Sequence, residues 1–343
     1  MRAVAYSETG DPDVLREIER PVPEPGPGEV RVRIHVSGVN PTDWKSRRAA
    51  GPAPFDQVVP NQDGAGVVDA VGPGVLDLHA GDRVWVWEAA WQRADGTSQE
   101  YVVLPADHVV PLPDDASFDL GASLGIPALT AHRCLTVADG GPDRLHPGAL
   151  EGRTVLVQGG AGAVGHAAIQ LARWAGARVL ATVSSPEKAE LARRAGAHDV
   201  IDYRATDAAT AVREVAPDGV DVVVEVAPGP NAELDEAVVG RDATVAIYAN
   251  NGGEEMTLAI RPHMTRNTRF QFVLVYTVPE RAKRNAVEDV TAAVAAGVLG
   301  VGEENGLPLH RFPLERTADA HAAVEGGVTG KVLVDVAPTP ASG

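Results

Sequence analysis

The chain has 343 residues, a length that exceeds one ordinary hydrophobic core and predicts two domains. Apolar residues make up 44% and charged residues 22%, as in globular proteins, which excludes a disordered or fibrous chain. The formal net charge of −17 argues against nucleic acid and anionic membranes as partners, because an acidic surface repels phosphate. We therefore expect a small-molecule partner, and an anionic cofactor would need locally placed positive groups.

Cysteine content and the N-terminus indicate the compartment. Cys134 is the only cysteine, which excludes an intramolecular disulfide and a cysteine-rich zinc lobe. It lies in the apolar run at 126–135, which predicts a packing role. No signal-like segment opens the chain, and no apolar run reaches the roughly 18 residues of a membrane span. These features predict a cytoplasmic protein.

Residues 1–120 have the pattern of a β-rich domain. Alternation of apolar and polar residues, punctuated by glycine and proline, predicts strands at 30–36, 64–71 and 83–87. The sequence pattern then changes, and it predicts a helix at 121–135 and a loop rich in glycine and proline at 139–152. We therefore expect a first domain at 1–124.

Strands and helices then alternate, which predicts a parallel sheet covered by helices on both faces. The predicted strands are 154–158, 178–183, 199–203, 221–226, 243–248 and 270–276, and the helices are 163–175, 186–195, 206–215 and 231–239. A long helix at 279–296, the segment PLHRF, a helix at 314–325 and the strand KVLVDV close the chain. The fold class is α/β: a β-rich domain, a doubly wound Rossmann domain at 125–275, and a C-terminal part at 276–343 that returns to the first domain.

The turn GGAGAVG at 159–165 follows a predicted strand and opens a predicted helix. Gly160, Gly162 and Gly165 satisfy G-x-G-x-x-G, whose glycines allow a tight turn, close approach of a pyrophosphate, and packing of helix on strand. The helix N-terminus adds free N–H groups and a positive dipole end. Since three further β-α units follow, we interpret the turn as a dinucleotide site rather than a simple glycine loop.

The end of the second predicted strand indicates which dinucleotide is bound. An NAD site usually has a carboxylate there, about 20 residues after the glycines, to accept from the ribose 2′-hydroxyl. Residues 178–186 contain none, and Ser184, Ser185, Lys188 and Tyr203 stand nearby instead. Hydroxyls and an ammonium suit a 2′-phosphate, so we expect NADPH. Ser185 as a helix N-cap and Lys188 as a solvated side chain are the structural alternatives.

The whole chain resembles the zinc-free quinone oxidoreductases of the medium-chain dehydrogenase/reductase superfamily, which include ζ-crystallin. The resemblance rests on segments such as SGVNPTDWKSR at 37–47, GDRVW at 81–85, LGIPALTAHRCL at 124–135, AGAHDVIDYR at 195–204 and HAAVEGGVTGKVLV at 321–334. It implies a GroES-like catalytic domain with a Rossmann domain inserted before its last portion. Zinc members carry a cysteine and a histidine where this chain has Asn40 and Gln62, so no metal is expected.

The resemblance also implies the cofactor contacts. The pyrophosphate would meet Ala161, Gly162, Ala163 and Val164, and Lys331 would add charge at the adenine end. The nicotinamide side would comprise Asn40, Thr130, Tyr248, Ala249, Asn250, Asn251, Phe272, Val273 and Leu274. At this strand end the family pattern is more glycine-like, whereas this chain has Tyr248, whose side chain would narrow the pocket. A homodimer is implied as well, formed by pairing of the segment 270–276 with its mate.

Hydride transfer by a nicotinamide needs no protein nucleophile, only orientation of the acceptor, exclusion of water and stabilisation of the anion that forms. We assign Asn40 to hydrogen bonding with the acceptor carbonyl or the nicotinamide ribose, and Lys45 to oxyanion stabilisation or proton supply. A turn role for Asn40, a helix cap for Asp43 and a solvated Lys45 are the structural alternatives. Trp44, Trp85, Trp87, Trp91 and Phe55 are candidates for an apolar pocket or for the core.

These features predict an NADPH-dependent, metal-independent reductase of quinones or other α,β-unsaturated carbonyls. One alternative is an enoyl, alkenal or polyketide-intermediate reductase on the same scaffold. Another, from a different class, is an NADPH-binding protein without turnover. The histidines His108, His132 and His166 lack metal-ligand spacing and are interpreted as structural.

Overall fold

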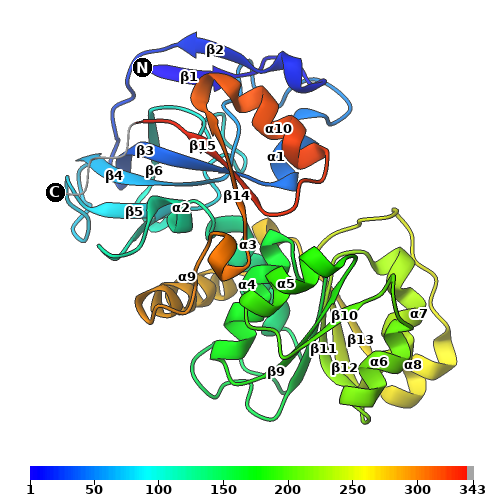
Figure 1. Cartoon of the computed structure of the whole chain (residues 1–343). Coiled ribbons are helices and arrows are strands. Elements are labelled where there is room, and N and C mark those ends of the chain that lie inside the picture. Colours follow the sequence, from blue (N-terminus) through cyan, green and yellow to red (C-terminus); the bar gives the residue numbers. More distant parts are fainter. Residues whose placement is uncertain (338–343) are drawn as a thin grey trace. The chain divides into compact units, whose positions relative to one another are not determined.

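The structure is a computed structural model that describes residues 1–337 (Figure 1). It divides into two compact units, one made of Met1–Ile126 together with the chain from Pro308 onward, the other of Pro127–Leu307. The first boundary lies close to the expected 124/125. The second differs from the expected 275/276, because residues 276–307 stay with the parallel-sheet unit. None of the helices in the described part of the chain is both long and apolar enough to cross a membrane.

The later boundary follows from the contacts of helix α9 (Glu280–Ala295). Its buried Asp289 binds the ring of His132 at 2.8 Å and accepts from Arg144 Nε at 2.7 Å and from the Leu145 backbone at 2.6 Å. Each of these partners lies in the second unit, so the helix is anchored there. Sequence periodicity located the helix but contained no information about what it packs on.

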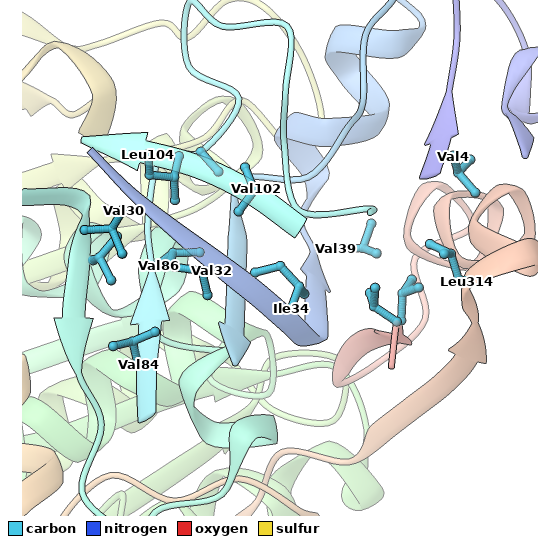
Figure 2. Close-up of a cluster of buried hydrophobic side chains, with 14 of the residues drawn as sticks. Val4, Val30, Val32, Ile34, Val39, Val84, Val86, Val102, Leu104 and Leu314 are labelled. Atoms are coloured by element: carbon cyan, nitrogen blue, oxygen red, sulfur yellow. The ribbon is translucent and has the colours of Figure 1, made fainter. Parts of the chain in front are cut away.

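The first unit is built on a seven-stranded sheet of order β14-β15-β3-β4-β5-β7, with β6 paired to β3 and a separate β1-β2 pair. Valine and leucine side chains that alternate along the strands form its core, and Figure 2 shows those of β3, β5 and β6 facing one another. The last strand pairs antiparallel with β3, so the C-terminal part does return to this unit. The elements are β1 (Arg2–Ala5), β2 (Arg16–Glu19), β3 (Glu29–Val39), α1 (Pro41–Arg47), β4 (Asp63–Val71), β5 (Arg83–Val86), β6 (Tyr101–Pro105), β7 (Val109–Pro111), α2 (Phe118–Gly121), β14 (Leu309–Pro313), α10 (Thr317–Glu325) and β15 (Lys331–Asp335).

The second unit contains a six-stranded, all-parallel sheet of order β10-β9-β8-β11-β12-β13. Strand order reverses between β8 and β11, so right-handed crossovers place helices on both faces, as in a Rossmann domain. This confirms the predicted fold class. The elements are β8 (Thr154–Gln158), α4 (Ala163–Trp174), β9 (Arg178–Val183), α5 (Pro186–Arg194), β10 (Asp199–Asp202), α6 (Ala208–Val215), β11 (Val220–Glu225), α7 (Pro228–Val238), β12 (Val239–Ile247), α8 (Ile260–Arg266) and β13 (Arg269–Phe272), followed by α9.

Two expected elements differ from the structure. The helix expected at 121–135 is α2 followed by a separate helix, α3 (Gly125–Leu135). The backbone N–H of Ile126 donates to Asp63 Oδ1 at 2.9 Å, and a Cβ on Gly125 would lie 2.2 Å from that oxygen. A partner distant in sequence therefore sets the start of α3. The strand expected at 270–276 ends at Phe272, and a 3₁₀ turn occupies Val275–Thr277.

Candidate functional site

The glycine turn connects β8 to α4 at the carboxyl end of the parallel sheet. Gly159 has φ of +68°, a left-handed conformation that glycine adopts without strain, and it reverses the chain after the strand. Gly162 then stands at the N-cap of α4, whose first N–H groups lack partners within the helix. The turn therefore offers backbone donors and a positive helix end at one place, as an anionic group requires.

Each later glycine of the turn has its own physical reason. A Cβ on Gly160 would lie 2.8 Å from the Ala181 Cβ, and one on Gly165 would lie 2.4 Å from the Gly159 carbonyl oxygen. These two glycines allow helix and strand to pack closely. A Cβ on Gly162 would meet only the Gly159 oxygen, at 3.5 Å, so the space beside this exposed residue stays open. Ala163 and Val164 next to it are partly exposed, whereas the side chain of Ala161 is buried.

The four residues expected near a 2′-phosphate lie together at the ends of β9 and β10. The Lys188 ammonium donates to Ser184 Oγ at 3.2 Å, and the Ser185 hydroxyl accepts from the Lys188 backbone at 3.3 Å as the N-cap of α5. The Tyr203 backbone donates to Val183 at 3.1 Å, which holds its half-exposed ring beside the end of β9. A hydroxyl, an ammonium and a phenol ring therefore follow the carboxyl ends of two adjacent strands, β9 and β10. Sequence analysis did not single out the exposed Glu187, which accepts from Ser185.

A pocket of about 700 Å³ lies at the ends of β12 and β13 in the second unit. Six of the residues expected on the nicotinamide side line it: Tyr248, Ala249, Asn250, Phe272, Val273 and Leu274. Asn251 is not among the lining residues, and its backbone donates to the Val226 carbonyl at 3.1 Å. The sequence did not indicate Glu254, Glu255 and Met256, which also line the pocket. Thr130 is buried within α3.

A buried polar cluster in the first unit contains Asn40. Its amide Nδ2 donates to Asp63 Oδ2 at 2.7 Å, and its Oδ1 accepts from the Lys331 ammonium at 2.7 Å. Lys331 Nζ also lies 3.6 Å from Asp63 Oδ2. The Asn40 backbone donates to Asp43 Oδ2 at 2.7 Å, which caps α1 as the structural alternative expected. These four side chains are at most 4% exposed.

Burial governs the ionisation of this cluster. Burial and, secondly, the neighbouring Asp63 carboxylate together raise the pKa of Asp43 to about 8. Burial also raises the pKa of Asp63, although Lys331 and the Asn40 amide act in the opposite direction. The pKa of Lys331 is lowered by burial against the attraction of the two carboxyl groups. With one ammonium for two carboxyl groups, the cluster is neutral when one carboxyl keeps its proton.

The position of Lys331 corrects one expectation. We expected its charge at the adenine end of the cofactor, but its side chain is 1% exposed and its ammonium is bound to Asn40 and Asp63. The reason is the pairing of β15 with β3, which sets Leu333 opposite Gly38 and brings the start of β15 beside Asn40. A Cβ on Gly38 would lie 3.1 Å from Lys331 Nζ, so a glycine there leaves room for the ammonium.

A second pocket, of about 440 Å³, lies within the first unit beside α1. Thr42, Asp43 and Ser46 of α1 line one side, and Phe55 and Trp91 supply aromatic surface, so two of the five aromatic candidates do line a pocket. Trp85 and Trp87 are core residues, at 1% and 5% exposure. Lys45 lies on the exposed side of α1, with Nζ 6.0 Å from the Trp44 ring centre. Gln62, also in the pocket wall, accepts from the Ala90 backbone at 3.0 Å.

The donor set does not fit zinc. Within residues 1–337 no group of three histidine, cysteine, aspartate or glutamate side chains is arranged to hold a metal ion. The Asn40 oxygen and Asp63 are both bound to the Lys331 ammonium, a cation that would repel a metal. The thiol of Cys134 is buried, which raises its pKa to about 12 and makes it unreactive.

Two family models match parts of the chain. The family described as "Alcohol dehydrogenase GroES-like domain" matches residues 26–114, and "Zinc-binding dehydrogenase" matches residues 163–293. Human quinone oxidoreductase is 30% identical over 341 residues, covering 97% of each chain.

Solved structures agree along the whole chain. A protein described as an NAD-dependent alcohol dehydrogenase is 30% identical, with a TM-score of 0.84 over 98% of this chain and 100% of the other. Escherichia coli quinone oxidoreductase, solved in complex with NADPH, is 25% identical, with a TM-score of 0.80 over 98% and 100% of the two chains. The chain is an oxidoreductase and belongs to the ζ-crystallin-like quinone oxidoreductases of the medium-chain dehydrogenase/reductase superfamily.

Proposed function

We propose that this oxidoreductase uses NADPH, without a metal, to transfer hydride to quinones or other α,β-unsaturated carbonyl compounds. The observation that carries the cofactor assignment is the Lys188 ammonium held 3.2 Å from Ser184 Oγ at the end of β9. A carboxylate that would bind a ribose 2′-hydroxyl is absent from residues 178–186. A 2′-phosphate would instead be paired with a cation and hydroxyl donors.

The residues of the second unit suit two parts of a dinucleotide, the pyrophosphate and the nicotinamide. The open space beside Gly162 and the N-terminus of α4 would receive the pyrophosphate, and the pocket formed by Tyr248, Phe272 and Leu274 would receive the nicotinamide. Once bound, the cofactor supplies the hydride. The chain's own residues orient it and keep water away.

The acceptor assignment rests on the chemistry of the first unit. The Asn40 oxygen accepts from Lys331 and one amide N–H donates to Asp63, so the second amide N–H is available to donate to a ligand. A free amide N–H suits a carbonyl oxygen of the acceptor as its partner. The aromatic wall formed by Phe55 and Trp91 suits a planar conjugated ring.

We also propose a cytoplasmic homodimer. The strand β13 lies at the edge of its sheet, and Phe272 and Leu274 at its end are 64% and 54% exposed. Pairing of this edge with a second copy would cover both groups. Selective C=C reduction and NADPH binding without turnover remain the alternatives to quinone reduction, and the assay below separates the three.

The test is steady-state oxidation of NADPH and NADH with a panel of quinones and a panel of enones, in the presence of a metal chelator. We expect NADPH to be preferred and chelation to have no effect. Lys188→Ala should raise the KM for NADPH about tenfold or more, because a charge-assisted hydrogen bond contributes ~1.5–3 kcal/mol, and leave the KM for NADH unchanged. Arg193→Ala, an exposed cation later on α5, is the matched control. Equal KM values for NADPH and NADH, or activity lost to the chelator, would overturn the proposal.

A further inference from the structure

We propose that four buried side chains of the second unit form a hydrogen-bonded row that positions the glycine turn and the segment after β11 for the dinucleotide. We call Thr182, Gln158, Asp235 and Glu225 the buried row. This inference rests on the proposed function and adds positioning residues to its cofactor site. The sequence pattern indicated none of the four.

Three members of the buried row come from neighbouring strands in register. Gln158, the last residue of β8, lies beside Thr182 of β9. On the other side of β8, the pairing of Val157 with Val224 sets the next residue of β11, Glu225, beside the same glutamine. Residues in register on parallel strands point to the same face of the sheet, so these side chains form one line at its carboxyl edge. All three are at most 1% exposed.

Hydrogen bonds run along the whole row. The Thr182 hydroxyl donates to Gln158 Oε1, and the Gln158 amide donates to Oδ1 of Asp235, on α7, at 3.2 Å. A side-chain hydrogen bond joins Asp235 to Glu225. Two carboxyl groups can share a hydrogen bond only when one of them is protonated. The row is therefore continuous only while this pair keeps one proton.

The surroundings of the pair assign that proton to Asp235. Glu225 accepts from the Ala227 backbone and from the Asn231 amide, which lies 3.0 Å from Oε1 and 3.2 Å from Oε2, so donors surround its carboxylate. Within residues 1–337, neither carboxyl has a cationic partner within 4.0 Å. Burial and, secondly, the Glu225 carboxylate hold the pKa of Asp235 well above its usual range. Asp235 is therefore the neutral donor and Glu225 the acceptor.

At one end of the buried row, Thr182 fixes the glycine turn. Its hydroxyl accepts from the Gly159 backbone at 3.4 Å, and its carbonyl accepts from the Gly160 backbone at 3.0 Å. These two bonds tie the turn to β9 just before Gly162, the N-cap of α4. The first N–H groups of α4 lack partners within the helix and would meet the pyrophosphate. Their direction therefore depends on Thr182.

At the other end, Glu225 fixes part of the pocket wall in the same unit. Its carboxylate accepts from the Ala227 backbone, and the next residue, Pro228, lines the pocket. Its backbone carbonyl accepts from the backbone of Tyr248, another lining residue, at 3.0 Å. Burial raises the pKa of the Tyr248 phenol above its usual range, so this group is neutral and does not compete for the proton of the pair. The buried row thus connects the turn with the pocket wall.

The first test breaks the row at Asp235. Asp235→Asn keeps an oxygen for Gln158 and an N–H for Glu225, whereas Asp235→Ala removes both. In fluorescence titrations we expect Asp235→Ala to raise the Kd for NADPH about tenfold or more, because both cofactor segments lose their connection. Asp235→Asn should stay within about twofold of wild type. Glu233→Ala, which removes an exposed carboxylate from the same helix, is the control and should bind as wild type does.

A second pair of variants tests the other end and serves even if Asp235→Ala does not fold. Thr182→Val has nearly the shape of threonine but no hydroxyl, so the Kd for NADPH should rise about fivefold, as for loss of one hydrogen bond. Thr182→Ser keeps the hydroxyl and should restore binding. Urea titration of each cofactor-free variant measures its stability separately.

Three results have distinct meanings. If Asp235→Ala and Thr182→Val lower the free energy of unfolding but leave the Kd for NADPH unchanged, the row only stabilises the fold and the inference is overturned. Equal Kd values for Asp235→Asn and Asp235→Ala would also overturn it, because the hydrogen bonds would then be irrelevant to binding. A wild type that binds neither NADPH nor NADH would instead overturn the proposed function.

Discussion

Removal of the Lys331 ammonium is the most informative perturbation of the buried cluster. In Lys331→Met the cation is lost, while Asp63, at 0% exposure, keeps its carboxylate and the Asn40 oxygen loses its donor. Breaking a buried pair by removing one partner costs ~3–5 kcal/mol, because a charge is left without compensation. We expect the free energy of unfolding to fall by about this amount in urea titrations at neutral pH. Lys45→Met, on the exposed side of α1, should change it by less than ~0.5 kcal/mol.

A double variant shows whether the loss arises from the pair itself. Asp63→Asn in the Lys331→Met background removes the uncompensated charge, so we expect the double variant to be more stable than Lys331→Met alone, by about 2 kcal/mol. Two results would refute this reasoning. One is a loss below ~1 kcal/mol for Lys331→Met, which would mean that other groups compensate the Asp63 carboxylate. The other is strict additivity of the two single variants, which would mean that the side chains are not coupled.

Three further predictions follow from the same contacts. Gly165→Ala should destabilise the second unit, because its Cβ would lie 2.4 Å from the Gly159 oxygen. Gly162→Ala should unfold like wild type but bind NADPH more weakly in fluorescence titrations. Equal unfolding curves for the two variants would contradict this prediction. The pKa of Asp43 rises on folding from 3.8 to about 8, so the unfolded chain loses the carboxyl proton at a lower pH than the folded chain does. The protonated carboxyl therefore stabilises the folded state most at low pH, and this contribution to the free energy of unfolding declines as pH rises from about 4 to about 8. The stability of Asp43→Asn relative to wild type should therefore increase from pH 4 to pH 8 in thermal melts, and a constant difference would show that Asp43 ionises alike in both states. Light scattering at micromolar concentration should give twice the mass of the chain, and a monomer mass would contradict the proposed dimer.

The glycine turn and its surroundings were predictable because their determinants are local. Gly160, Gly162 and Gly165 lie within a few residues of the strand and helix that they join, so sequence pattern alone implies their geometry. The same holds for Lys188 and Ser184, which are four residues apart in the sequence. The alternation of strands and helices likewise predicted a parallel sheet covered by helices on both faces, which the structure has.

The buried cluster could not be predicted because its partners are distant in sequence. Lys331 is 291 residues from Asn40, and only the antiparallel register of β15 with β3 brings them together. Asp63 is 63 residues from Ile126, whose N–H it binds at the break between α2 and α3. A signal was nonetheless present: Asp63 and Lys331 are charged residues at the first positions of their strands, each followed directly by buried glycine or apolar residues. Such a residue is buried only with a partner, which the sequence cannot name.

The most direct test of the proposed reaction is transfer of label from the cofactor. NADPH carrying deuterium at C4 of the nicotinamide is mixed with the protein, an enone and a chelator, and the product is analysed by mass spectrometry and NMR. Direct hydride transfer predicts one deuterium at the β-carbon of the saturated product and none acquired there from solvent. Absence of product, or a product whose β-hydrogen comes from water, would contradict the assignment of this chain as an NADPH-dependent reductase of conjugated carbonyls.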